Sequence, residues 1–207
     1  MKDLGILLDS KLSFIPHYDL LCSKACRMLG FVKRNSTEFK DFLTLKSLYC
    51  SLVRSQLEYG SIIWNPNYQV HSDRIERIQK SFTRLALVRY GFVFSELPSY
   101  PIRCKLLGLE TLSNRRQISS ISFIHDILSG KFSCSDLLRL LNFNVPSRCL
   151  RFNSLLLVPF HSTNYGQNEP ITRSILFFNE FSSNFNFHLS RDSFLNNIKL
   201  AIYFPSR

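Results

Sequence analysis

The sequence lacks the short motifs that mark the common nucleotide-binding and hydrolytic sites. It contains no GxxxxGK[ST], no GxGxxG, no GxSxG and no HExxH. Acidic residues never stand next to each other, and Asp3, Asp9 and Asp19 are too dispersed to hold two metal ions about 3.5 to 4 Å apart. The histidines are isolated, and we interpret His17 and His71, each beside an expected helix start, as caps or solvated residues. We therefore expect no catalytic residue, no metal site and no cofactor in this chain.

Long apolar runs and paired cysteines are also lacking. No apolar stretch approaches the ~20 residues that cross a bilayer, and the first residues do not form a secretory signal. These two absences predict an intracellular protein, nuclear or cytoplasmic, without a membrane partner. The six cysteines form no CxxC pair, so we interpret them as core thiols in a reducing compartment. Cys22 and Cys26 could form half a metal site, but two small residues on one helix face are the favoured interpretation.

Positive charge is in clear excess. The chain of 207 residues has 26 Lys and Arg against 15 Asp and Glu, a formal net charge of +11, while 45% of its residues are hydrophobic. The hydrophobic share is enough for a core in one domain or two small ones. The charge indicates a polyanionic partner, either nucleic acid or an anionic membrane face. Residues 1–120 hold 18 of the basic and 10 of the acidic residues, so the first half makes the stronger electrostatic case.

Hydrophobic periodicity predicts a mainly α-helical chain. Asp41 is a plausible N-cap, and Gly60 followed by Asn65-Pro66 predicts a helix end beside which Trp64 packs as an anchor. The segment LGILLD, with Gly5 inside it, predicts a short N-terminal strand, and a small extended element is expected near residues 149–160. The expected helices run from His17 to about Phe31, from the Asp41 cap to near Gly60, and over the segment 71–87. A short helix before Gly108, a longer one from Thr111 or Ser113 to Gly130 and two further helices within 170–202 follow.

The segment HSDRIERIQKSFTRLAL is the most amphipathic of these helices. At about 100° per residue its apolar side chains share one arc and its cations share another, with Ser72 or Asp73 as the expected cap. A solvated basic face without any ligand is the alternative interpretation. The apolar arc comprises Ile75, Ile78, Phe82 and Leu85, and the basic arc comprises Arg74, Arg77, Lys80 and Arg84.

Two further basic pairs complete the candidate phosphate-binding residues. Lys33 and Arg34 lie at the end of the first expected helix. Arg115 and Arg116 lie near the start of a later helix, where positive charge opposes the helix dipole. This placement indicates an outside partner for the second pair, either a phosphate or a carboxylate, and a surface salt bridge is as good an explanation as a phosphate.

Five segments of the chain match a known family in type and in order. They are DLGILLDSKLSFIPHYDLLCSKACRMLGFVKR, LKSLYCSLVRSQLEYGSIIWNP, DRIERIQKSFTRLAL, RCKLLGLETLSNRR and VPFHSTNYGQNEPITRSILFFN. In this order, over nearly the whole chain, they resemble the region downstream of the catalytic palm in reverse transcriptases of LINE-type, jockey-like retrotransposons that lack long terminal repeats. The resemblance implies three parts: a remnant of a palm-edge strand at 1–14, a helical thumb-like region at 15–95 and a C-terminal helical region at 96–207.

The same resemblance limits the expected activity. Family enzymes copy RNA into DNA with magnesium held by palm aspartates, including a Tyr or Phe followed by Ala-Asp-Asp, and this chain has no such motif. Met1 is then expected to be an internal methionine of a truncated element copy. The expectation is a non-catalytic fragment of an RNA-directed DNA polymerase, with no magnesium of its own.

Sequence-independent nucleic-acid binding is the function that these observations predict. Thumb-like helices in the family grip the template and primer, and Lys and Arg contacts to phosphates give affinity without reading bases. The expected partners are RNA, DNA or an RNA–DNA duplex, together with the missing palm region. Two alternatives stay open: a helical protein-interaction module, whose apolar faces are left bare by the missing palm, and a decayed open reading frame without a selected function.

Overall fold

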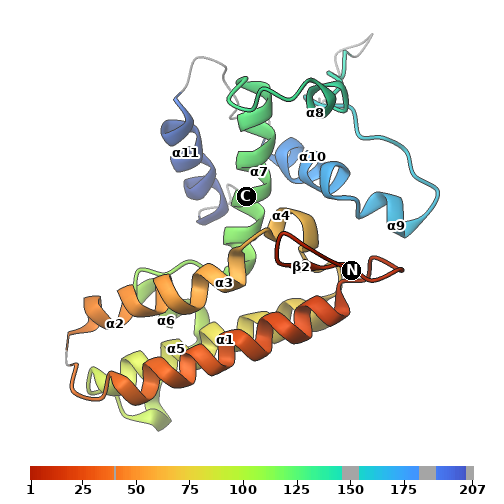
Figure 1. The fold of residues 1–207 in the computed structure, drawn as a ribbon. Helices are drawn as coiled ribbons and strands as arrows, with labels where there is room; N and C mark the ends of the chain where they lie inside the picture. Colours follow the sequence, from red (N-terminus) through yellow and green to blue (C-terminus); the bar gives the residue numbers. More distant parts are fainter. Residues whose placement is uncertain (40, 146–153, 182–189, 204–207) are drawn as a thin grey trace. The chain divides into compact units, whose positions relative to one another are not determined.

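The chain is mainly α-helical, as the sequence predicts, and it has a short two-stranded antiparallel sheet near its N-terminus (Figure 1). The structure is a computed structural model that describes residues 1–39, 41–145, 154–181 and 190–203. Its contacts divide the chain into two compact units, Met1–Arg115 and Arg116–Arg207, called unit 1 and unit 2 below. Within the described ranges, no helix combines the length and apolarity needed to cross a membrane.

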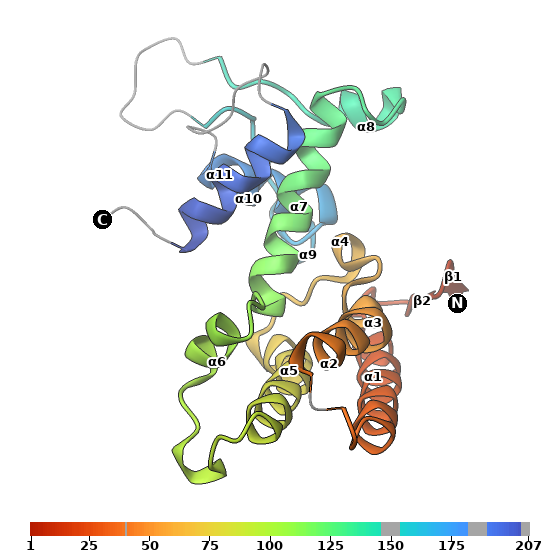
Figure 2. The same cartoon turned by 90° about the vertical axis from the view of Figure 1, so that its left-hand side faces the viewer.

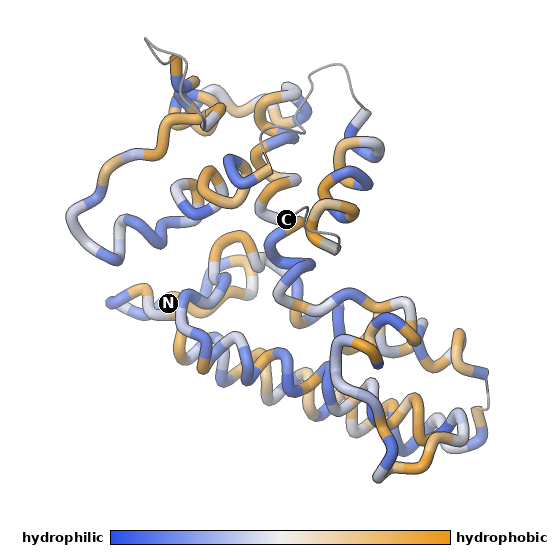
Figure 3. The backbone as a smooth tube through the Cα atoms, turned by 180° about the vertical axis from the view of Figure 1, so that it is seen from behind, coloured by the Kyte–Doolittle hydropathy of each residue, from blue (hydrophilic) through white to orange (hydrophobic). Residues whose placement is uncertain are grey.

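Unit 1 is built around two long helices that lie side by side (Figure 2). Both are amphipathic, and hydrophilic and hydrophobic positions alternate along them at helical spacing (Figure 3). The helices of unit 1 are α1 (Ile15–Asn35), α2 (Phe42–Leu48), a π-helical segment (Tyr49–Arg54), α3 (Ser55–Glu58), α4 (Ser61–Trp64), α5 (Gln69–Arg89), a 3-10 turn (Phe94–Glu96) and α6 (Tyr100–Leu106).

Aromatic side chains fill the core of unit 1. The rings of Tyr49 and Phe82 stack with their centroids 3.9 Å apart, which joins the π-helical segment to α5. Trp64 is fully buried, and its indole N–H donates to the carbonyl of Tyr59 at 2.8 Å. Tyr18 of α1 in turn donates its hydroxyl to the carbonyl of Trp64 at 2.8 Å. The predicted role of Trp64 as a core anchor is confirmed.

The N-terminal strand differs from the prediction, because LGILLD is a hairpin and not one strand. Strand β1 (Lys2–Asp3) pairs antiparallel with β2 (Ile6–Leu7), in the register Lys2 with Leu7 and Asp3 with Ile6. Leu4 and Gly5 form the turn with φ of 42° and 89°. Gly5 adopts this conformation without steric strain, so the chain reverses where alternation alone predicted that it would continue.

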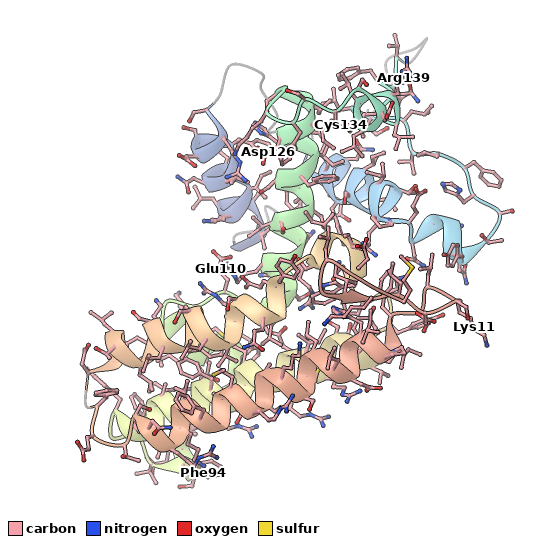
Figure 4. The ribbon with its side chains drawn as sticks, viewed as in Figure 1. Lys11, Phe94, Glu110, Asp126, Cys134 and Arg139 are labelled. Carbon is pink, nitrogen blue, oxygen red and sulfur yellow. The ribbon has the colours of Figure 1, made fainter. Side chains whose placement is uncertain are left out.

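Unit 2 has its own core, separate from that of unit 1. Its centre includes Ile121, Ile124, Phe178 and Phe194, all fully buried or nearly so. Asp126, which is labelled in Figure 4, accepts a hydrogen bond from Arg191 Nε at 2.7 Å. This bond joins the last helix of unit 2 to its first helix. The helices are α7 (Leu112–Leu128), whose first turn belongs to unit 1, α8 (Ser135–Arg139), α9 (Asn164–Gln167), α10 (Pro170–Glu180) and α11 (Arg191–Tyr203).

The extended element expected near 149–160 is present in part. Phe143 forms an isolated antiparallel bridge with Leu156, and the amide of Leu157 donates to the carbonyl of Asn142 at 2.7 Å. Residues 149–153 of the prediction lie outside the described residues.

Candidate nucleic-acid interface

A groove of about 570 Å³ runs between α1 and α5 of unit 1. Small side chains occupy its middle, which is why the two helices leave open space there, and cations stand along its length. The small lining residues are Ser23, Cys26 and Gly30 of α1 and Ser81 of α5, and the lining cations are Lys33 of α1 with Arg74 and Arg77 of α5.

The groove is held at both ends by arginines of α5. Near the helix starts, Arg74 forms an ion pair with Asp19 of α1. Near the helix ends, Arg89 donates to the carbonyls of Lys33 and Ser36 at 2.7 and 2.6 Å and so satisfies C-terminal carbonyls of α1. The pairs show that α1 and α5 run parallel, so the lining residues stay in a fixed register.

The amphipathic pattern of α5 decides which of its side chains face this groove. Ile75, Ile78 and Phe82 are buried as predicted, and Leu85 is half-buried. The predicted cap is wrong, because α5 begins at Gln69, with no side-chain cap, and runs on through Ser72 and Asp73. Asp73 instead accepts a hydrogen bond from Gln69 Nε2 at 2.9 Å, so it supports the first turn from inside the helix.

Four of the predicted phosphate-binding cations remain available to a ligand. Lys33, Arg34, Arg77 and Arg84 are all exposed. None of them forms an ion pair with a carboxylate in the part of the chain that the structure describes. We call these four residues the basic set.

Two further cations of the predicted arc of α5 are committed in part. Arg74 is paired with Asp19, and this hydrogen bond raises the pKa of Arg74, although 44% of its side chain stays exposed. Lys80 is half-buried, with Nζ 5.3 Å from the centre of the Tyr100 ring, a cation–π distance. Both groups are already partly neutralised or desolvated, so they contribute less to a phosphate site than the basic set.

The pair at the start of α7 has internal partners. Arg115 forms a bidentate hydrogen-bonded ion pair with Glu58, which raises the pKa of Arg115. Of the two partners that the sequence left open for Arg115, the carboxylate is therefore the one found. Arg116 is only 2% exposed, and such burial leaves no surface for a phosphate. We therefore remove both residues from the candidate interface.

A buried polar network on the other side of α5 was missed at the sequence level. Glu76, Gln79 and Thr83 are buried at i, i+3 and i+7, which places them on one stripe of the helix beside the apolar residues. That spacing was the available signal, since polar residues on a buried stripe need hydrogen-bond partners.

Glu76 holds the start of α7. Its carboxylate accepts the amides of Leu112 at 2.9 Å and Ser113 at 3.2 Å, and it also accepts the hydroxyl of Tyr100. Gln79 lies one turn further, where it donates to Glu110 O at 2.7 Å and accepts from Tyr49 at 2.9 Å. The carboxylate takes the place of an N-cap side chain, so this network belongs to the scaffold of unit 1 and is not part of the candidate interface.

The cysteine prediction holds for some residues and fails for others. Cys22 and Cys104 are buried free thiols, and burial raises the pKa of each, as expected for core residues. Cys26 and Cys134 are exposed, so the core interpretation is wrong for them. Cys149 lies outside the described residues. Over the described ranges, no three or more His, Cys, Asp or Glu residues are grouped so that they could hold a metal ion.

Fold and site together define a mainly helical protein with a basic groove between two parallel helices. No protein-family model matches the chain, and no solved structure matches it. The chain is similar to an uncharacterized protein of Caenorhabditis elegans, B0403.1, with 27% identity over 145 residues, which are 69% of this chain and 70% of that protein. The name of this relative states no activity, so a functional argument has to start from the groove and the sequence.

Proposed function

We propose that unit 1 binds nucleic acid through its phosphates, without reading the base sequence, and that the chain derives from the thumb-like part of a retrotransposon reverse transcriptase. The observation that carries the proposal is the basic set: four exposed cations on two helices held in fixed register. The resemblance of five ordered segments supports the origin. In this proposal the chain grips a duplex in the nucleus or cytoplasm, beside a palm region, and does not polymerise.

Electrostatics gives the proposal a quantitative form. Each phosphate that a Lys or Arg neutralises releases condensed counterions, so the affinity falls with salt at a slope of about −0.9 per contact on duplex DNA. Four contacts predict a slope of about −3.6 in log affinity against log salt. Between 50 and 200 mM salt this slope lowers the affinity by about a hundredfold. Apolar association has no comparable salt dependence.

The test replaces the basic set one residue at a time. Lys33→Gln, Arg34→Gln, Arg77→Gln and Arg84→Gln should each weaken duplex binding by a similar factor for every sequence tried, and each should reduce the salt slope by about one. Fluorescence anisotropy of a labelled duplex at several salt concentrations measures both quantities. The fold should be unaffected, since all four side chains are exposed.

A matched control makes the same charge change elsewhere. Arg139 of α8 in unit 2 is also exposed (Figure 4), and Arg139→Gln should leave the salt slope unchanged. The proposal is wrong if the four variants of the basic set bind the duplex with the wild-type slope. If they also melt at lower temperature, the basic face serves the fold, and the protein-interaction module becomes the better hypothesis.

A further inference from the structure

The segment that follows α5 exposes three aromatic rings in a row of five residues. Tyr90 is 69% exposed, Phe94 is 68% exposed and Phe92 is 39% exposed. Single exposed apolar side chains are common on protein surfaces, whereas several exposed rings within one short segment are a candidate binding site.

The backbone of this segment has a defined conformation. Gly91 has a φ of +102°, its amide donates to the carbonyl of Val88 at 3.1 Å, and the amide of Phe92 donates to the carbonyl of Leu87 at 3.1 Å. These two bonds are the Schellman motif that ends a helix with a glycine in the left-handed region. A 3-10 turn follows at Phe94–Glu96. The rings are therefore carried on an ordered backbone, which lowers the entropy lost when a ligand binds.

The segment with the rings begins beside the C-terminal end of α1, where Lys33 and Arg34 lie. Arg89, the residue before Tyr90, bonds to the carbonyls of Lys33 and Ser36, so the segment starts beside the C-terminal end of α1. Both long helices end on the same side of unit 1 (Figure 2), and Phe94 lies on the outside of the loop that follows α5 (Figure 4). The ring segment therefore starts next to the end of the groove at which Lys33 lies.

We propose that Tyr90, Phe92 and Phe94 form a stacking platform for unpaired bases, so that the preferred ligand is a duplex with a single-stranded extension. This inference rests on the proposed function, because the basic set must hold the phosphates that lead the strand to the rings. Every base has a π face, and a basic track beside aromatic rings is the combination that binds single strands without sequence preference. A protein partner would also cover the rings, but the neighbouring Lys33 and Arg34 favour an anionic ligand.

The test compares a blunt duplex with the same duplex carrying a single-stranded tail of about eight nucleotides, a length within the usual range of single-strand sites. The full chain should bind the tailed duplex about tenfold more tightly. The double variant Tyr90→Ala/Phe94→Ala should lose this preference and keep the wild-type affinity and salt slope for the blunt duplex.

The control uses an exposed ring at the other end of the same helix. Tyr68, 71% exposed, directly precedes α5, and Tyr68→Ala should keep the preference for the tailed duplex. If Tyr68→Ala abolishes the preference and the double variant does not, the platform is misplaced and the inference fails. Glu96 adds a directional check, because Glu96→Gln removes a carboxylate beside the rings and should strengthen binding of the tailed duplex.

The outcomes separate this inference from the proposed function. If the wild-type chain binds both duplexes equally with a steep salt slope, the platform is refuted and the phosphate groove stands. If it binds neither duplex, both proposals fail. If the double variant loses blunt-duplex binding as strongly as tailed-duplex binding, the rings serve the groove or the fold, and base stacking is rejected. If the tail preference survives in the double variant, a protein partner is the better explanation for the exposed rings.

Discussion

At the scale of single residues, the role of a cation depends on the group that its charge faces. The guanidinium of Arg89 faces helix carbonyls, and that of Arg115 faces the carboxylate of Glu58, so both hold the fold together. Arg77 and Arg84 face water. Only a cation of the second kind can exchange a counterion for a phosphate without first breaking an internal bond, so residues of one type divide between scaffold and interface.

A buried histidine is expected to make the stability of the N-terminal hairpin depend on pH. His17 is 5% exposed, and its Nδ1 accepts the amide of Leu7 in the N-terminal hairpin at 3.3 Å. Burial lowers the pKa of His17 below its ordinary value of 6.5, and the charge of Lys24 lowers it further. Below pH 6.5 the unfolded chain therefore takes up a proton that the folded chain resists. The stability that neutral His17 contributes is present above pH 6.5 and is lost as the pH falls through the lowered pKa.

We therefore expect the hairpin to open on acidification. The exchange protection factor of the Leu7 amide should fall as the pH is lowered from neutral to well below 6.5, because protonated Nδ1 can no longer accept its hydrogen bond. Nuclear magnetic resonance with amide exchange measures it. His17→Gln cannot titrate but still offers an acceptor oxygen, so its protection should vary much less with pH. Equal protection of wild-type Leu7 at neutral and at acidic pH would contradict this assignment.

At the scale of elements, helices with a continuous apolar stripe could be predicted from the sequence, and short or cap-dependent features could not. The stripes of α1, α5 and α7 recur at 3.6-residue spacing over several turns, so tertiary context does not change them. In the hairpin, two strands of two residues give the same alternation as one longer strand. For α5, Ser72 was predicted as a cap although the helix begins upstream without any side-chain cap.

The candidate site could also be predicted only in part from the sequence. The exposed cations of α5 follow from the helical wheel, because the apolar arc fixes which side faces water. The ion pair of Arg115 could not be predicted in this way, because its partner Glu58 lies 57 positions away in the sequence and no local pattern indicates the pair. The rings after α5 were also missed, since exposure depends on what the rest of the fold leaves uncovered.

At the scale of elements, the carboxylate of Glu76 at the start of α7 gives a testable prediction about stability. Glu76→Ala leaves the buried amide of Leu112 and the partly buried amide of Ser113 without their acceptor. A buried unsatisfied donor costs about 1 to 3 kcal/mol, and a partly buried one costs less because water can replace the acceptor. The free energy of unfolding in urea should therefore fall by about 2 to 4 kcal/mol. Glu96→Ala removes an exposed carboxylate and should change it by less than about 0.5 kcal/mol. Equal stability of the two variants would show that Glu76 does not cap α7.

At the scale of the whole molecule, the basic residues and the proposed binding residues are unevenly distributed between two units with separate cores. The basic set and the proposed aromatic platform both belong to unit 1, and the sequence through residue 120 carries 18 of the 26 basic residues. Unit 2 has a core of its own around Phe178 and Phe194. If the two cores fold independently, a destabilising substitution in one core should leave the stability and the binding properties of the other unit unchanged. Helix α7 starts in unit 1 and continues through unit 2, so it is the element through which they could be coupled.

Matched Phe→Ala substitutions in the two cores test whether the two units fold independently. Phe82 of unit 1 and Phe178 of unit 2 are 0% and 1% exposed, and replacing either with Ala should cost about 3 to 5 kcal/mol of local stability. We expect Phe82→Ala to reduce amide-exchange protection in α1 and α5 and to weaken duplex binding, because the groove depends on the register of those helices. Phe178→Ala should reduce protection in α10 and α11, while duplex binding and its salt slope stay at the wild-type values. Amide exchange read by mass spectrometry, with anisotropy on the same samples, measures both effects. Loss of protection throughout the chain in both variants would mean that α7 couples the units into one cooperative structure, and nucleic-acid binding would then depend on residues far outside the groove.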